Sequence, residues 1–433
     1  MQDDAGLSET AHRVLAARCK PGGQGQVVGP GGAGGEPEIG DAIAYPGGYV
    51  VGLVRRSAAG RVAAAAFLEP GANAVSRVVD LGLTPDDAPP PRLAWRSDEL
   101  LVAAYGTARG GAQADKVREL LLYTLTPAAN PTPLLSVPQR RDDSLAFDMA
   151  SSGRNAVVVW DEAMGAARGV VRGAVIAPGD HSVRPRDVSP AESDAELPRV
   201  VVNGSGYSAL WIARAPDPGV LPADSGGSGP EAVGETRANG WIESLDLEEH
   251  GEPSGRVRTL TPHNGHVSGY DVEVLVGVPT PSLIVVARDD GEAKDGSGGV
   301  LLRVRVLKDT VEPPVAFAID GLGRGAPTLV PFASKWSAES RDKPSDTRVR
   351  DPGTKPGGTW LAWVDAHEQL RLLPLDETGS PRGLPSVEED MNEARPLLFL
   401  PQAEQADGGA LVYALAAAPS KADAQLRIFA CTP

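Results

Sequence analysis

RVVVNGSGYSALWIAR, residues 199–214, contains two short apolar runs joined by a tight Asn-Gly-Ser-Gly turn. Runs of β-branched and aromatic residues bounded by such turns are typical of a β-hairpin. Six other places repeat the pattern of a turn followed by an apolar run. The seven runs begin at Tyr49, Leu100, Ala156, Ser208, Ser282, Thr359 and Ala410, and they read YVVGLV, LLVAAY, AVVVW, SALWIA, SLIVVA, TWLAWV and ALVYAL. Self-similarity at this spacing predicts a repeat architecture made of strands.

Each repeat divides into four candidate strands, of which the apolar run is the second. The first strands are short and aliphatic, as strands buried on both faces tend to be. Their expected ranges are 41–45, 92–95, 144–149, 199–202, 270–276, 326–330 and 395–400. Third strands such as 299–307 (GVLLRVRVL) alternate polar with apolar residues, which indicates one wet face. Fourth strands are weaker, and the seventh unit reaches Pro433 without one.

The seven turn-plus-run units resemble β-propeller repeat proteins over about residues 41–433. The resemblance implies an all-β fold, a seven-bladed β-propeller of four-stranded antiparallel blades, with six or eight blades as alternatives. Residues 1–40, which hold a Gly-rich tract, form a separate N-terminal segment. The signature motifs of sialidase-like, WD and kelch blades are absent or incomplete, so no family's functional residues are carried over.

The N-terminal segment is expected to close the ring, because an open ring would leave unpaired strand edges. Two stretches within residues 10–30 are candidates for the closing strand, HRVLAARC and GQVVGP.

Closure would bring Cys19 next to Cys431 in the last strand, and we predict a disulfide between them. A disulfide implies an oxidising, extracytoplasmic location. The alternative is two unrelated buried thiols in a cytoplasmic protein. The start of the chain has no secretory signal, so this prediction treats it as a mature form.

The formal charge of −16 and the pI near 4.9 argue against binding to nucleic acid or to an anionic membrane surface. No apolar run approaches the roughly 18 to 20 residues that span a bilayer, so the chain is not expected to cross a membrane. The content of Gly (51) and Pro (39) suits many strands joined by turns and disfavours long helices.

Long loops are expected to gather on one face at the fourth and fifth blades. Up-and-down topology assigns 215–239, 261–269 and 288–299 to the same face, whereas 334–356 projects from the opposite one. Long loops on rigid scaffolds commonly carry function. The candidate binding face consists of His263, Asn264, His266, Asp289, Asp290 and Glu292. The two imidazoles and the acids suit a transition metal, but we interpret the stretch as a solvated loop and predict no metal, no cofactor and no catalytic residue there.

Ionisable residues on the expected innermost strands form a second group. Asp148, Asp271 and Glu273 would face the central channel, where burial perturbs carboxyl pKa values. Arg92, Arg199 and Arg395 open three of the first strands and would line the same mouth. The structural alternative is that these acids bind water or backbone amides.

These features favour an extracytoplasmic binding or scaffolding module that uses the loops of one face. A carbohydrate-active hydrolase or lyase is the alternative, and a structural subunit of a surface assembly is a third possibility. The expected partner is a protein or a carbohydrate. An enzyme requires ionisable groups gathered in a concave site, whereas a binder requires only a loop-rimmed or apolar patch.

Overall fold

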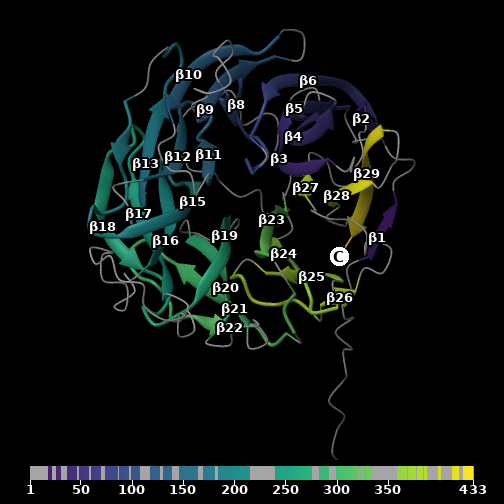
Figure 1. Cartoon of the computed structure of the whole chain (residues 1–433). Coiled ribbons are helices and arrows are strands. Elements are labelled where there is room, and N and C mark those ends of the chain that lie inside the picture. Colours follow the sequence, from purple (N-terminus) through teal and green to yellow (C-terminus); the bar gives the residue numbers. More distant parts are fainter. Residues whose placement is uncertain are drawn as a thin grey trace, which may run out of the picture.

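The computed structural model of the 433-residue chain is built from antiparallel β-strands. It describes residues 18–432 apart from short turns and the longer segments 31–36, 108–117, 139–145, 215–238, 276–281, 292–298, 333–357, 388–397 and 401–411. Figure 1 shows the sheets arranged around a common centre. The fold is therefore a β-propeller, as the sequence predicted.

Six sheets have four antiparallel strands each, and the strands follow one another in chain order from the centre outward. The first two are β3 (Glu38–Tyr45), β4 (Gly48–Ser57), β5 (Gly60–Leu68), β6 (Val75–Leu83) and β7 (Arg92–Arg96), β8 (Glu99–Thr107), β9 (Arg118–Leu125), β10 (Thr132–Pro138). The next two are β11 (Phe147–Ser151), β12 (Ala156–Ala163), β13 (Gly169–Ile176), β14 (Arg186–Asp187) and β15 (Asp194–Asn203), β16 (Gly206–Arg214), β17 (Gly240–Leu247), β18 (Pro253–Thr259). The last two are β19 (Val267–Leu275), β20 (Ser282–Asp289), β21 (Val300–Val306), β22 (Val315–Ala316) and β23 (Thr328–Phe332), β24 (Gly358–Val364), β25 (Leu370–Leu375), β26 (Ser386–Val387).

The remaining strands come from both ends of the chain and form one five-stranded sheet. It contains β27 (Leu398–Leu400), β28 (Val412–Ala418), β29 (Asp423–Thr432), β1 (Arg18–Pro21) and β2 (Gln26–Pro30). The ten-residue β29 is long enough to pair with both N-terminal strands, β1 near its end and β2 near its start. The structure thus corrects the predicted count of seven four-stranded blades to six, because the last repeat does not form a four-stranded blade of its own.

The hydrophobic core lies between neighbouring sheets. One cluster joins Leu101 and Tyr105 of β8 to Phe147 of β11 and Trp160 of β12. The rings of Tyr105 and Phe147 meet edge to face with centroids 5.1 Å apart, a favoured aromatic geometry. Similar clusters join each described four-stranded sheet to the next. Second strands such as β4, β16 and β20 are therefore buried on both faces, which explains the unbroken aliphatic runs in the sequence.

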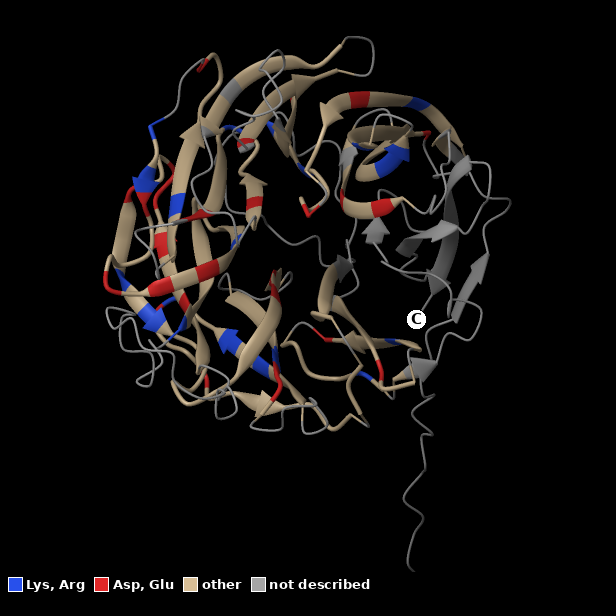
Figure 2. Ribbon diagram, in the orientation of Figure 1, with Lys and Arg blue, Asp and Glu red and all other residues tan. Residues whose placement is uncertain are grey.

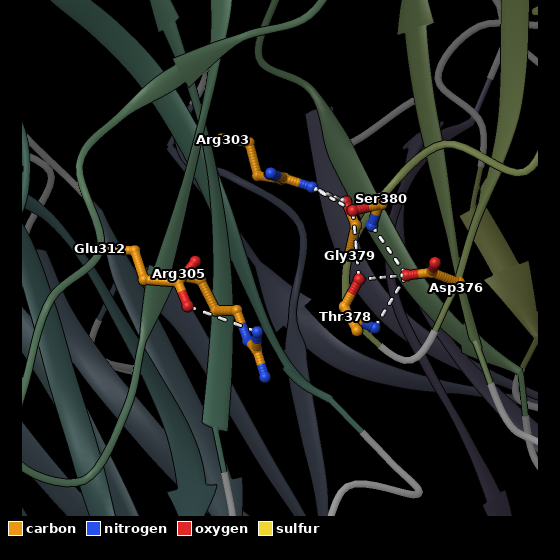
Figure 3. A network of polar contacts seen from close by, with 7 residues as sticks. All are labelled: Arg303, Arg305, Glu312, Asp376, Thr378, Gly379 and Ser380. Atoms are coloured by element: carbon orange, nitrogen blue, oxygen red, sulfur yellow. Dashed lines mark hydrogen bonds and ion pairs between the residues drawn. The ribbon is translucent and has the colours of Figure 1, made fainter.

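Polar contacts between sheets add to this packing at their outer parts. Figure 3 shows Arg303 of β21 reaching the turn after β25, where it donates to the carbonyl of Gly379 (3.0 Å) and to Ser380 (2.8 Å). Asp376 closes that turn by accepting hydrogen bonds from the backbone N–H groups of Thr378 and Ser380. The same carboxylate accepts from the Thr378 hydroxyl, and these bonds hold the pKa of Asp376 below its usual value despite burial.

Gly379 is expected to tolerate no side chain. It has a φ of +74°, and a Cβ there would lie 2.6 Å from Cδ1 of Ile284. Replacing it by alanine should lower the free energy of unfolding by about 2 kcal/mol, from backbone strain and overpacking together. Gly255→Ala is the control, because Gly255 has a φ of +84° and open space around it. Urea unfolding should show a loss of only about 1 kcal/mol for the control. Equal losses would mean that the contact with Ile284 does not matter.

None of the described residues forms a helix long and apolar enough to cross a membrane.

Candidate functional site: a charged ring on the innermost strands

Charged side chains alternate in sign around the innermost strands of five consecutive sheets. Carboxylates come from Asp41 on β3, Asp148 on β11 and Asp271 on β19, and guanidinium groups come from Arg92 on β7 and Arg199 on β15. Figure 2 shows acidic segments on β3, β11 and β19 near the centre of the molecule. We call these five residues the charged ring.

The ring residues lie at nearly the same height along their strands. Asp41, Arg92, Arg199 and Asp271 each stand four positions before the last residue of their strand, at Tyr45, Arg96, Asn203 and Leu275 respectively. Asp148 stands three positions before Ser151. Because innermost strands of neighbouring sheets contact one another, equal height brings these side chains together.

Each aspartate of the ring accepts a hydrogen bond from the backbone of the next sheet's innermost strand. The N–H of Leu93 donates to Asp41 (3.0 Å), that of Val200 to Asp148 (3.0 Å), and that of Leu329 to Asp271 (2.7 Å). The innermost strand is the inner edge of its sheet, so its N–H groups have no further strand to pair with. The aspartates satisfy those donors and join one blade to the next.

The arginines lie between the aspartates. Arg92 Nε is 3.6 Å from Asp148 Oδ1, and Arg199 Nε is 3.9 Å from Asp271 Oδ1. These side chains are mostly buried, with exposed fractions of 27% for Arg92, 12% for Asp148, 25% for Arg199 and 23% for Asp271. Burial of charges costs free energy unless they are paired and hydrogen-bonded. Asp148 and Asp271 meet both conditions, and Arg92 and Arg199 are paired with them.

Irregularities in the strands position two members of the ring. The pairing of β3 with β4 shifts between Ile39 and Ala42, so Asp41 lies within a bulge. The pairing of β15 with β16 shifts between Glu196 and Arg199. Leu197 in this second bulge has a φ of 51°, which is unusual for a leucine. Bulges redirect side chains and recur next to functional sites.

Hydrogen bonds from two neighbours hold the bulge at Leu197. Its backbone N–H donates to Asp161 (3.2 Å), and its carbonyl accepts from the hydroxyl of Tyr270 (2.9 Å). Strained backbone persists only where the surrounding structure enforces it. Burial, opposed by Arg199, raises the pKa of Tyr270 well above its usual value, so this phenol keeps its proton.

Burial has the largest effect on the pKa values of Asp41, Arg199 and Asp271 in the charged ring. It raises the pKa of Asp41 to about 6, although Arg92 and the Leu93 N–H oppose the change. It also raises the pKa of Asp271, against the opposing effect of Arg199. For Arg199 burial alone would lower the pKa, but Asp148 and Asp271 raise it above its ordinary value. The guanidinium of Arg199 therefore stays charged, while the pKa of Asp41 lies at about 6.

Glu273 adds a fourth carboxyl group to the site. It lies two residues after Asp271 on β19 and therefore on the same face of the strand. Burial raises its pKa to about 8, helped by the nearby charges of Asp271 and Asp148 and opposed by a hydrogen bond from the Val274 N–H. At neutral pH Glu273 is mostly protonated, and it can donate a proton or a hydrogen bond.

Replacing Glu273 by glutamine is expected to remove a pH dependence of stability. The folded-state pKa of about 8 lies above the unfolded value near 4.3, so the wild type loses stability as pH rises between them. Glu273→Gln should match the wild type near pH 4 and exceed its free energy of unfolding by roughly 2 kcal/mol at pH 9. Urea unfolding across this range measures the difference. A variant that tracks the wild type at every pH would show that Glu273 ionises freely.

The loop residues of the candidate binding face contact one another and the strands beneath them. The ring of His263 packs on Trp241 with centroids 4.6 Å apart, and Asn264 is exposed. The backbone N–H of His266 donates to Asp289 (3.2 Å). Asp290 is buried and paired with Arg288 (2.5 Å). Glu292 lies outside the described residues, as do Arg395 and most of 215–239.

A metal site is not formed by the part of the chain that the structure describes, where no three His, Cys, Asp or Glu residues are grouped to hold an ion. Among these described residues, His263, His266, Asp289 and Asp290 form no such group. Their use as a binding face stays a prediction.

The backbone register places Cys19 of β1 directly opposite Cys431 of β29. Nothing further of these two side chains is described, and the disulfide stays a prediction.

Comparison with known proteins identifies the fold. No protein-family model matches the chain, and no curated protein matches its sequence. The solved structure of the polysaccharide lyase Uly1 is similar with a TM-score of 0.53 and 9% identity, over 90% of this chain and 89% of that one. An ulvan lyase representing a new polysaccharide lyase family is similar with a TM-score of 0.51 and 10% identity, over 95% of both chains. The β-propeller domain of the trilobed protease from Pyrococcus furiosus has a TM-score of 0.44 and 10% identity, over 91% of this chain and 93% of that one.

Likeness at these identities shows architecture alone. Together with the sheet topology it defines the chain as a β-propeller protein.

Proposed function

We propose that this protein is an extracytoplasmic binding protein that takes a carbohydrate-class ligand at its charged ring. The observation that carries the proposal is the convergence of four carboxyl and two guanidinium groups on the innermost strands. Guanidinium groups only donate hydrogen bonds and carboxylates only accept them. Sugar hydroxyls do both, so an alternating ring suits a polyhydroxylated ligand better than an apolar one.

Two further points support this proposal. Two of the similar solved structures are named as polysaccharide lyases, so this architecture accommodates polysaccharides in other proteins. The facing positions of Cys19 and Cys431 favour an oxidising compartment, where extracellular glycans are met.

Calorimetric titration with neutral, uronate-containing and amino-sugar oligosaccharides tests the proposal. We expect at least one class to bind the wild type, and Glu273→Ala to weaken that binding about tenfold because one carboxyl partner is removed. The matched control is Glu312→Ala, which removes a distant carboxylate that pairs with Arg305 at 3.3 Å (Figure 3). Failure of every oligosaccharide to bind, or equal weakening by both variants, would overturn the proposal.

A carbohydrate-active hydrolase or lyase is the second candidate, and Glu273 is the observation that favours it. A carboxyl group that keeps its proton at neutral pH, two residues from the arginine-paired Asp271, suits general acid catalysis. Turnover would produce new reducing ends in a hydrolase and an unsaturated, ultraviolet-absorbing uronate in a lyase. Glu273→Gln should then abolish turnover while retaining some binding. Unchanged turnover in that variant would remove Glu273 as the acid.

A further inference from the structure

A cavity of about 240 Å³ lies between two neighbouring sheets, on strands β13 and β17 and away from the charged ring. Its floor is aliphatic and comes from Val157, Val175, Val188 and Leu247. Three of these are nearly fully buried, with exposed fractions of 1% for Val157, 6% for Val188 and 4% for Leu247. None of these four floor residues is aromatic, which favours an aliphatic group over the face of a sugar.

The rim of the cavity carries cationic side chains. Arg184, Arg186 and His250 line it together with one carboxylate, Asp180. Arg186 is paired with Glu252 at 2.6 Å, and Asp180 accepts a hydrogen bond from the N–H of Ala177 at 2.9 Å. Arg184 is exposed and makes no ion pair with any residue that the structure describes.

Two contacts fix parts of the cavity wall. Arg96 is buried, with an exposed fraction of 1%, and its guanidinium donates to the carbonyl of Ala177 at 2.6 Å, three residues before Asp180. Gly251 has a φ of +75°, and a Cβ there would lie 2.3 Å from Cγ2 of Val175. The absence of a side chain lets the turn that carries His250 approach the aliphatic floor.

We propose that this cavity binds an aliphatic carboxylate. The hydrocarbon part lies on Val157, Val175 and Leu247, and the carboxylate pairs with Arg184 beside His250. A volume of about 240 Å³ equals about eight water volumes, which suits an acid the size of leucine. Asp180 and Glu252 flank the site and disfavour a doubly charged anion such as phosphate. The ligand is either a free acid or the C-terminal residue of a peptide, since both present the same chemistry.

Calorimetric titration with three probes distinguishes these sources. The probes are N-acetyl-leucine, acetyl-Ala-Ala-Leu with a free C-terminal carboxylate, and the same peptide as its C-terminal amide. We expect the free acids to bind at least tenfold more tightly than the amide. Tighter binding of the peptide acid than of N-acetyl-leucine identifies a peptide C-terminus as the ligand, and the reverse order identifies a free acid.

Arg184→Gln should weaken binding of the preferred acid at least tenfold. Arg184 is exposed, so the variant should retain the wild-type unfolding midpoint, which is measured alongside. Arg256→Gln is the matched control, because Arg256 is an equally exposed arginine on β18 that does not line the cavity. The proposal is overturned if neither acid binds, if the amide binds as tightly as the acids, or if Arg184→Gln binds like the wild type.

Discussion

Replacing Cys431 by serine is expected to lower the free energy of unfolding of the oxidised protein by about 4 kcal/mol. Cys19 and Cys431 are directly opposed in the antiparallel pair of β1 and β29. Opposed residues in such a pair have Cα atoms about 4.5 to 5.5 Å apart, which lies within the span of a disulfide. A bond between them would close a loop containing nearly the whole chain, and long loops give the largest loss of unfolded-state entropy.

Urea unfolding of the wild type and of Cys431→Ser, each with and without a reductant, measures the effect. The reductant should reduce the stability of the wild type to that of the variant and leave the variant unchanged. Peptide mapping of the unreduced protein by mass spectrometry should recover the peptides of Cys19 and Cys431 joined. Recovery of two free thiols from air-exposed protein would contradict the disulfide and remove the main support for an extracytoplasmic location.

Replacing Arg199 by methionine is expected to destabilise the fold by about 3 kcal/mol at pH 7. The guanidinium lies near both Asp148 and Asp271, and its positive charge offsets the cost of burying these two carboxylates. Methionine has a similar length and leaves Asp271 without its arginine partner, and Asp148 with Arg92 alone. Arg199 also lies at the end of the bulge that contains Leu197, where the pairing of β15 with β16 shifts.

The loss of stability caused by Arg199→Met should become smaller as the pH falls. Burial already raises the pKa of Asp271, and removal of Arg199 raises it further, so acid protonates this group and relieves the unpaired charge. Urea unfolding at pH 7 and pH 5 tests this, with Arg256→Met as the exposed arginine control. A loss that is the same at both pH values would assign the effect of Arg199 to packing and not to charge.

The positions of the ring residues could be partly predicted from the sequence. Asp148, Asp271 and Glu273 fall on expected first strands, and Arg92 and Arg199 open two of them, so the repeat pattern placed all five near the centre. Asp41 opens a first strand in the same way, but it was missing from that prediction. Comparing the first residues of all the first strands would have revealed it.

Two features of the ring depend on the three-dimensional structure. The bulges at Asp41 and Leu197 set the height of two members, and a bulge leaves no clear mark in single-sequence patterns. The hydrogen bonds from Leu93, Val200 and Leu329 to the three aspartates link strands more than 50 residues apart. The spacing of residues within a short stretch of sequence cannot predict hydrogen bonds between such distant strands.

The sequence alone determined the all-β repeat architecture, because turn residues and apolar runs act locally through backbone preference and burial on both strand faces. Tertiary structure decided how the ends meet, with β29 pairing both N-terminal strands and leaving six four-stranded blades. It also decided which charges become neighbours and which carboxyl groups keep their protons. Those properties depend on distance and burial, and both arise only when the sheets close around a common centre.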